Sequence, residues 1–268
     1  DSSSAASDVY KRQAYTGNVN VNNFDMGRWL GQQKMLGNIS MTSHVEGEGV
    51  KFENMDIALN GNISKLEVNN YPYSNIKLDG TFRKQFFEGK IDVKDPNLIQ
   101  QFGGTVDFQG AQPKLKFKSG IQLANLMKLN FSTSDYRFNG KINIDIEGLD
   151  IETATGKAGL YDVKLLDKRR MYTLDSFVVA STRQDSFRTV TLNSEILDAE
   201  FKGDFLFGEM PAAVQKLLGD YFPESGLMEG QEVPSQKMEY AINIRDTRNL
   251  MKLIAPGLSD ITGASVSG

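Results

Sequence analysis

Apolar and polar residues alternate along most of this sequence, and the alternation is cleanest in residues 73–97, YSNIKLDGTFRKQFFEGKIDVKDPN. There, Ile76 and Leu78 alternate with Lys77 and Asp79, and the pattern returns after a charged turn. Side chains of a β-strand point alternately to the two faces of its sheet, so a period of two predicts strands with one apolar and one polar face. The apolar face must then be covered, either by more protein or by a ligand.

Short runs of this kind, bounded by Gly, Asn or Asp, continue along the chain. Many of the 25 glycines lie at the ends of runs, where turns that need a positive φ favour Gly and Asn. Asp95-Pro96-Asn97 fits a type I turn with proline at its second position. Consecutive antiparallel strands joined by short turns form a meander rather than βαβ units. We therefore expect an all-β fold, an elongated antiparallel meander curled into a trough with an apolar lumen and braced by short helices.

The alternating runs and the interruptions between them give an expected element for most of the chain. Strands are expected at 18–24, 38–45, 54–64, 65–82, 87–93, 104–110, 114–123, 141–151, 159–166, 171–182, 188–194, 198–207 and 237–244. Helical segments are expected at 25–31, 124–130, 211–222 and 246–257.

Two series of strands, each with a helical ending, form a weak internal repeat. We expect the first β-groove series at 14–130 and the second at 131–209. Residues 210–268 are expected to form a helical insertion and a return strand that is cut short. Residues 1–13 have no periodicity and resemble an adapter-derived tail or cloning remnant, so they are left out of the fold prediction. We expect the chain to be an internal piece of a longer protein.

The composition excludes several classes of function. A formal net charge of −4, with charges interspersed, gives no electrostatic case for binding nucleic acid. The absence of cysteine excludes thiol catalysis and thiolate metal sites. A hydrophobic fraction of 40% is ordinary for a globular protein and too high for a disordered one. No apolar run approaches the roughly 18 residues that a membrane helix needs.

Candidate catalytic residues are few. His44 is the only histidine, and its alternating surroundings, TSHVEGEG, predict a surface position. The acid pairs Asp92/Asp95 and Asp145/Glu147 could serve glycoside hydrolysis, which needs two carboxylates about 5 to 10 Å apart, but we expect them to be solvated charges on the polar face. Nucleophile-elbow, phosphate-loop and zinc-helix motifs are absent from the sequence. We therefore expect no enzyme activity, no metal and no cofactor.

The apolar face leaves two interpretations open, the packed core of a β-sandwich and the lining of a gutter. Open sheets of more than about ten strands tend to curl, split or close. A curled sheet with its apolar side inward, open along one side, exposes apolar surface that needs a ligand. The residues expected to line this lumen and bind lipid are Ile57, Leu59, Ile76, Leu78, Phe82, Phe87, Ile91, Val93, Val106, Phe108, Leu115, Phe117, Ile142, Ile144 and Ile146.

Four segments carry a family resemblance: Asn70–Ile76 (NYPYSNI), Gly89–Asn97 (GKIDVKDPN), 141–160 and 198–207. With their surroundings, over most of residues 14–265, they resemble the TamB/AsmA-like family, in particular the long TamB-type proteins of Bacteroidota. The resemblance implies a periplasmic β-groove that carries phospholipids from the inner to the outer membrane. It also implies an inner-membrane anchor, further repeats of the same chain, and a link to outer-membrane β-barrel assembly proteins.

An apolar groove has a clear physical advantage for lipid transfer. Each CH₂ group of an acyl chain gains about 0.8 kcal/mol when it is shielded from water, so the groove lowers the barrier that water imposes. We therefore expect a non-catalytic segment of a lipid conduit. The alternatives are a scaffold or adhesion module that binds protein or glycan and, from the acid pairs alone, a β-helical glycan-processing enzyme.

Overall fold

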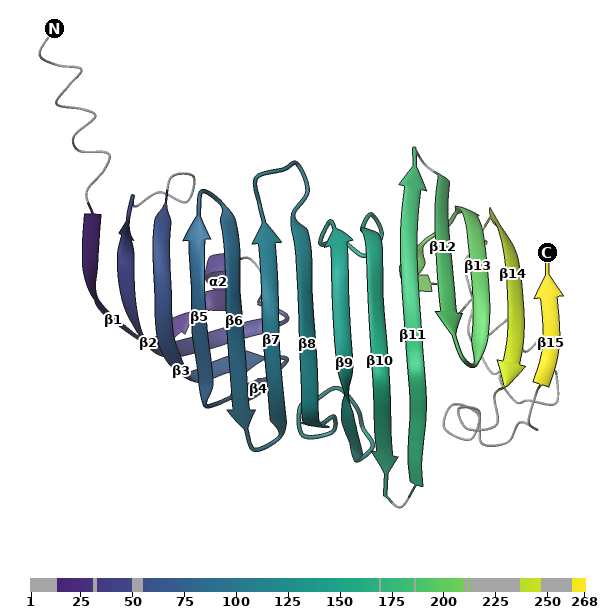
Figure 1. Cartoon of the computed structure of the whole chain (residues 1–268), viewed down its shortest axis with the longest axis horizontal. Helices are drawn as coiled ribbons and strands as arrows, with labels where there is room; N and C mark the ends of the chain where they lie inside the picture. Colours follow the sequence, from purple (N-terminus) through teal and green to yellow (C-terminus); the bar gives the residue numbers. More distant parts are fainter. Residues whose placement is uncertain are drawn as a thin grey trace, which may run out of the picture. The chain divides into compact units, whose positions relative to one another are not determined.

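The computed structural model describes residues 14–30, 33–49, 55–168, 170–185, 187–209, 212, 237–246 and 262–268. Its strands form one antiparallel sheet of 15 strands whose order follows the chain (Figure 1). The exception is the short strand β4, which pairs only with β3, so that β5 is the next strand of the main path. The all-β antiparallel meander predicted from the alternation is confirmed.

Strands make up most of the described residues. They are β1 (Ala14–Asp25), β2 (Leu36–Glu48), β3 (Asp56–Val68), β4 (Tyr71–Tyr73), β5 (Ile76–Arg83), β6 (Phe86–Asp95), β7 (Leu98–Asp107), β8 (Lys114–Asn125), β9 (Tyr136–Glu147), β10 (Thr155–Asp167), β11 (Arg170–Gln184), β12 (Phe187–Ser194), β13 (Leu197–Asp204), β14 (Lys237–Asp246) and β15 (Thr262–Ser267). Two helical elements are described, the α-helix α2 (Met26–Leu30) and the 3₁₀ turn η2 (Phe207–Glu209).

The chain divides into two compact units. Unit 1 extends to Asn143 and includes residues 165–171. Unit 2 comprises residues 144–164 and 172–268. The division falls within β9, after the boundary at 130/131 expected from the sequence.

The two helical segments predicted inside unit 1 had different outcomes. The segment at 25–31 contains α2, where Asp25 Oδ1 accepts a hydrogen bond of 2.8 Å from the N–H of Arg28, as an N-cap does. The prediction for 124–130 was wrong, because this segment forms turns after β8. A single turn, in which the N–H of Leu129 donates to the carbonyl of Asn125 at 3.0 Å, is enough to direct Leu129 into the core.

Three predicted strands were too long at their C-terminal ends. Near two of these ends, aspartate side chains form local hydrogen bonds that turn the backbone. Asp107 Oδ1 accepts from the N–H of Gln109 at 2.8 Å, and Asp150 Oδ1 accepts from the N–H of Glu152 at 2.9 Å. The predictions concerned are 104–110, 141–151 and 198–207.

Some expectations fall on residues outside the description. These are the adapter-like residues 1–13 and the helices predicted at 211–222 and 246–257. Of the two helical ranges only Ala212 and Asp246 are described, and Asp246 ends β14.

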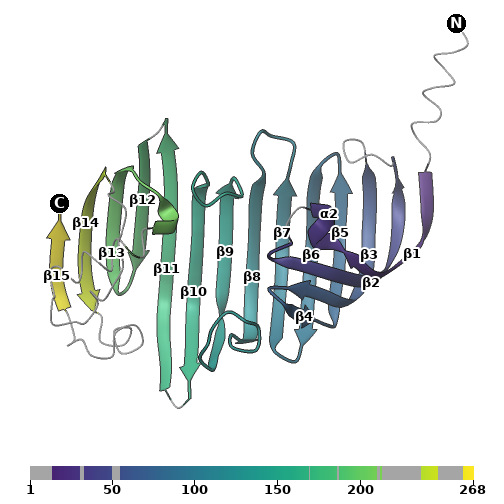
Figure 2. The ribbon, with the colours of Figure 1, turned by 180° about the vertical axis from the view of Figure 1, so that it is seen from behind.

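One end of unit 1 is closed by its own chain. Figures 1 and 2, seen from opposite sides, show β4 and the adjoining parts of β2 and β3 crossing the sheet over β5–β7. The crossing segment packs on the sheet through a cluster of buried side chains. This cluster is formed by Ile39, Ile63, Tyr73, Ile76, Val93, Leu98, Ile121, Ala124 and Leu129. We call this region the closed end.

Irregular strand pairing accompanies the crossing. The register between β2 and β3 shifts between Leu36 and Ile39 and again between Ser40 and Met41. Such bulges bend a strand and increase its twist. The amides of Asn69 and Asn130 then join the crossing segment to the turn after β8, since each side chain donates to the other residue's carbonyl, at 2.8 and 3.0 Å.

A buried carboxylate holds the closed end together. Asp95 is 2% exposed and accepts hydrogen bonds from the Tyr71 hydroxyl (2.6 Å), the Ser74 N–H and hydroxyl (3.0 and 2.9 Å) and the Asn97 N–H (2.8 Å). The Asn97 amide also donates to the Tyr71 hydroxyl at 2.9 Å. The prediction that Asp95 is a solvated acid was therefore wrong. Its hydrogen bonds offset the cost of burying a charge.

Unit 2 has its own core and its own buried ion. Its core cluster is formed by Val190, Ala199, Phe201, Phe205, Ile242 and Ile244, on β12 to β14 and just after β13. Beside it, the Arg188 side chain is 4% exposed. The Arg188 guanidinium donates to the Ser181 hydroxyl at 3.0 Å and to the carbonyls of Ile151, Glu152 and Ala154 at 2.9, 3.1 and 3.0 Å.

The Arg188 guanidinium also lies 5.1 Å from the centre of the Phe207 ring in η2. Glu152 adds a second link to η2, because its carboxylate accepts from the N–H groups of Phe207 and Gly208 at 2.6 and 2.8 Å. The loop between β9 and β10 is thereby fixed to β12 and to η2. Burial lowers the pKa of Arg188, and the charge of Glu152 opposes that shift.

The Asp95 network predicts a dependence of stability on acid. Burial raises the pKa of Asp95, but the hydrogen bonds from Tyr71, Asn97 and Ser74 outweigh it and leave the pKa below its usual value. The network therefore stabilises the fold above the unfolded pKa of about 4 and loses this effect as the pH falls through the folded pKa. We expect Asp95→Asn to cost about 1–3 kcal/mol in urea unfolding at pH 7 and much less at pH 3.

Asp92→Asn, on the polar face of the same strand, is the matched control and should change stability by less than about 0.5 kcal/mol. Equal losses for the two variants at pH 7 would contradict the role given to Asp95.

Tyr73 predicts a second dependence, on alkali. It is 7% exposed, and burial, with the charges of Tyr71 and Asp95, raises its pKa to about 12. Stability present below the unfolded pKa of about 10 is therefore lost as the pH rises through about 12. We expect the unfolding free energy of Tyr73→Phe to fall less than that of the wild type between about pH 10 and pH 12. An unchanged fall in the variant would count against burial as the cause.

Candidate functional site

The apolar face of unit 1 is built from four rows of residues that lie opposite one another on β3, β5, β6, β7 and β8. Row 1 contains Ile57, Phe82, Phe87, Val106 and Leu115. Row 2 contains Leu59, Gly80, Gly89, Gly104 and Phe117. Row 3 contains Gly61, Leu78, Ile91, Phe102 and Ser119. Row 4 contains Ile63, Ile76, Val93, Gln100 and Ile121.

Burial changes across the rows. The apolar side chains of row 4 belong to the closed end and are at most 9% exposed. The apolar side chains of rows 1 to 3 are only half-buried. We call rows 1 to 3 the open rows. The face therefore passes from a packed core in row 4 to a partly exposed apolar surface in the open rows.

Row 2 has three consecutive glycines, and the Phe87 ring lies against two of them. A Cβ atom on Gly89 would be 2.6 Å from Cζ of Phe87, and one on Gly80 would be 3.0 Å from the same ring. A Cβ atom on Gly104 would collide with Phe117. The Phe87 ring thus lies close to the backbone of its own strand and of β5, which buries part of the ring within a single sheet.

Most of the predicted lining residues lie together on these rows. Ile76 and Val93, however, are packed in the closed end. Phe108 lies beyond the end of β7 and is 37% exposed. Ile142 packs against the core of unit 1. Ile144 and Ile146 are half-buried residues of unit 2.

Ile63, Gln100, Phe102, Ser119 and Ile121 lie on the same face and are missing from the predicted lining. The available signal was that each lies an even number of residues from a predicted lining residue on its own strand. Phe102 contacts Phe117, with ring centres 4.6 Å apart. Gln100 Nε2 donates to Ser119 Oγ at 2.7 Å, and Ser119 is 5% exposed. This polar pair interrupts the apolar rows where the open rows meet the closed end.

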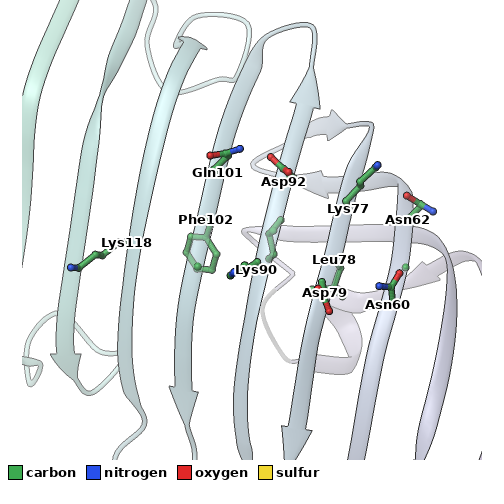
Figure 3. Close-up of a pocket in the computed structure, with 13 residues that line it drawn as sticks. Asn60, Asn62, Lys77, Leu78, Asp79, Lys90, Asp92, Gln101, Phe102 and Lys118 are labelled. Carbon is green, nitrogen blue, oxygen red and sulfur yellow. The ribbon is translucent and has the colours of Figure 1, made fainter.

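The opposite face of the same strands carries a polar hollow of about 740 Å³. Figure 3 shows amide and charged side chains of β3 and β5–β8 around it. Across β5 and β6, Lys77 lies opposite Asp92 and Asp79 lies opposite Lys90. Asp92 therefore lies on the polar face, as predicted. The hollow is lined by Asn60, Gly61, Asn62, Lys77, Leu78, Asp79, Lys90, Ile91, Asp92, Gln101, Phe102, Gly103 and Lys118.

His44 is also a surface residue, as predicted. It lies on β2, and its side chain is 48% exposed. Its ring nitrogens lie 3.0 Å from Asn18 Oδ1 and 3.1 Å from Glu46 Oε1. Asp145 and Glu147 are exposed on β9. Within the described ranges, no group of three or more acidic or histidine side chains could hold a metal ion.

The described part of the chain has no helix of the length and apolarity needed to cross a membrane. Comparison with protein-family models, with curated proteins and with solved structures gave no match.

The contact between Phe87 and Gly89 predicts a steric sensitivity that is confined to one face. Gly89→Ala must displace the Phe87 ring, so we expect a loss of about 1–3 kcal/mol in unfolding free energy. Gly103→Ala is the control, because a Cβ atom there lies on the polar face, 3.6 Å from Cγ of Lys90. It should cost less than about 0.5 kcal/mol in the same urea titration. Equal losses of unfolding free energy in the two variants would show that contact with the Phe87 ring does not cause the loss.

Proposed function

We propose that this chain is a non-catalytic segment of a lipid conduit and that its open rows shield phospholipid acyl chains from water. One observation carries the proposal: half-buried apolar side chains continue in register across five paired strands. The chain as a whole is rich in charged residues, at 24%. An exposed apolar surface on such a chain is typical of a binding site for an apolar partner.

The dimensions of the open rows suit an acyl chain. Neighbouring strands are about 4.8 Å apart, so a row that runs from β3 to β8 is about 19 Å long. An acyl chain occupies half of a hydrocarbon core of about 30 Å, or about 15 Å. The glycines of row 2 add no side chains of their own, and the Phe87 ring of row 1 lies against two of them. A chain lying along the rows would therefore contact apolar side chains on both sides.

The chemistry of the open rows suits the same ligand. Each shielded CH₂ group contributes about 0.8 kcal/mol. Rows 1 to 3 contain no Lys, Arg, Asp or Glu, so a charged head group would find no counter-ion there. Since an unpaired buried charge is costly, the head group would stay in water beside the rows. Such a surface binds many lipids through their chains and performs no reaction.

The resemblance to the TamB/AsmA-like family extends this proposal to the full-length protein. In that setting the chain would lie in the periplasm, in a protein anchored in the inner membrane. Further repeats of the same chain would prolong the groove, and phospholipid would move toward the outer membrane. An outer-membrane β-barrel assembly protein would be a partner in outer-membrane biogenesis.

The polar hollow favours a second candidate function, a scaffold or adhesion module that binds glycan or protein. Asn60, Asn62 and Gln101 offer amide groups there, and lysine and aspartate side chains alternate around them. Amides and charged groups of both signs can hydrogen-bond to the hydroxyl groups of a sugar. This candidate uses the opposite face of the same strands, so single substitutions separate the two.

The lipid proposal predicts a face-specific effect of a single charge. Val106 and Thr105 are neighbours on β7, and only Val106 belongs to the open rows. We expect Val106→Lys to reduce co-purified phospholipid at least several-fold, measured by lipid mass spectrometry, because the ammonium group would lie among the acyl chains. Thr105→Lys should leave the lipid content unchanged, and circular dichroism would check the fold of both variants.

Wild-type protein that never carries phospholipid would contradict the proposal, as would equal effects of the two lysines. Glycan binding lost through Asp79→Ala or Lys90→Ala, with lipid absent, would favour the second candidate.

A further inference from the structure

The Gln100–Ser119 pair is the polar exception on an otherwise apolar part of the face. Gln100 lies in row 4 between Val93 and Ile121, and Ser119 lies in row 3 beside Phe102. The pair is therefore surrounded by apolar neighbours on β6, β7 and β8.

The hydrogen-bonding capacity of the pair is only partly used. A glutamine amide has two N–H donors and a carbonyl acceptor, and a serine hydroxyl has one donor. Their mutual bond of 2.7 Å uses one amide donor and one acceptor site of the hydroxyl. Among the described residues, the Ser119 O–H and the Gln100 carbonyl have no other partner. Buried polar groups normally use their donors, and Ser119 is 5% exposed, so the unused donor of its hydroxyl points to a ligand group that accepts a hydrogen bond.

The surroundings limit the chemistry of that group. No Lys, Arg, Asp or Glu belongs to rows 1 to 4. A charged phosphate or amine placed at the pair would therefore lack a counter-ion and lose its hydration. A neutral acceptor satisfies the Ser119 hydroxyl without this cost. The ester carbonyl that joins an acyl chain to glycerol is such a group.

We propose that Gln100 and Ser119 bind the ester linkage of a diacyl lipid whose chain lies on the open rows. This inference rests on the proposed lipid-shielding function and adds a selectivity to it. The acyl chain would follow rows 2 and 3 from β8 toward β3, with its ester at Ser119. The pair then favours ester-linked lipids over ether-linked lipids, which have the same chains but no carbonyl.

The test is a competition between two lipids that differ only in this linkage. Vesicles containing equal amounts of dihexadecanoyl phosphatidylethanolamine and its dihexadecyl ether analogue are incubated with the full chain, and bound lipid is quantified by mass spectrometry. Because a neutral hydrogen bond is modest in strength, we expect the wild type to favour the ester lipid about 3- to 10-fold. The double variant Gln100→Met/Ser119→Ala should bind less of the ester lipid, with a ratio near one.

Gln101→Met, on the polar face, is the matched control and should keep the wild-type ratio, and thermal unfolding would report the fold of each variant. A wild-type ratio near one, or a preference that survives in the double variant, would overturn the inference. Loss of both lipids from a folded double variant would also overturn it, because the pair would then support the face rather than recognise the ester. If the wild type binds neither lipid, the proposed function itself fails.

Discussion

Strand register is the constraint on which this structure depends. Successive side chains of a strand point to opposite faces, so a slip of one residue would exchange the apolar and polar faces of that strand. The pairings of β3 with β5, β5 with β6, β6 with β7 and β7 with β8 all preserve the same alignment through rows 1 to 4. A continuous apolar surface and a polar hollow on its reverse side are both consequences of that alignment.

Buried polar groups divide into two kinds in this protein. Asp95 and Arg188 are surrounded by hydrogen-bond partners from distant parts of the chain, and each fixes a loop or a crossing segment in place. Gln100 and Ser119 share one hydrogen bond and keep capacity to spare. The first kind is typical of structural support, because most of its hydrogen-bonding capacity is already used within the chain. The second kind leaves room for recognition within a surface that otherwise offers only apolar contact.

The alternation was sufficient to predict the strands, the meander and the face on which most lining residues lie, because these depend on local periodicity. It could not predict the closed end. The bulges in β2 and β3 shift the phase of the alternation, as from Ile63 to Leu66, but they do not show what the bent strands cover. Ile76 and Val93 therefore looked no different from Leu78 and Ile91. Asp95 stands in an Asp-Pro-Asn turn that is usually solvated, and its partners Tyr71 and Ser74 are more than 20 residues away. Gln100 and Ser119 were missed because a search for apolar residues passes over polar ones in the same register.

Because the glycines of row 2 have no side chains, the surface shape of the open rows depends on residues of more than one strand. The Phe87 ring lies against Gly80 and Gly89, so these two glycines set the contour at that ring. A bulkier residue at either glycine would displace the ring into the path of a bound chain. The depth of the surface under a bound molecule thus depends on a glycine together with the aromatic residue that lies against it. A change of that depth during evolution would need substitutions at both positions.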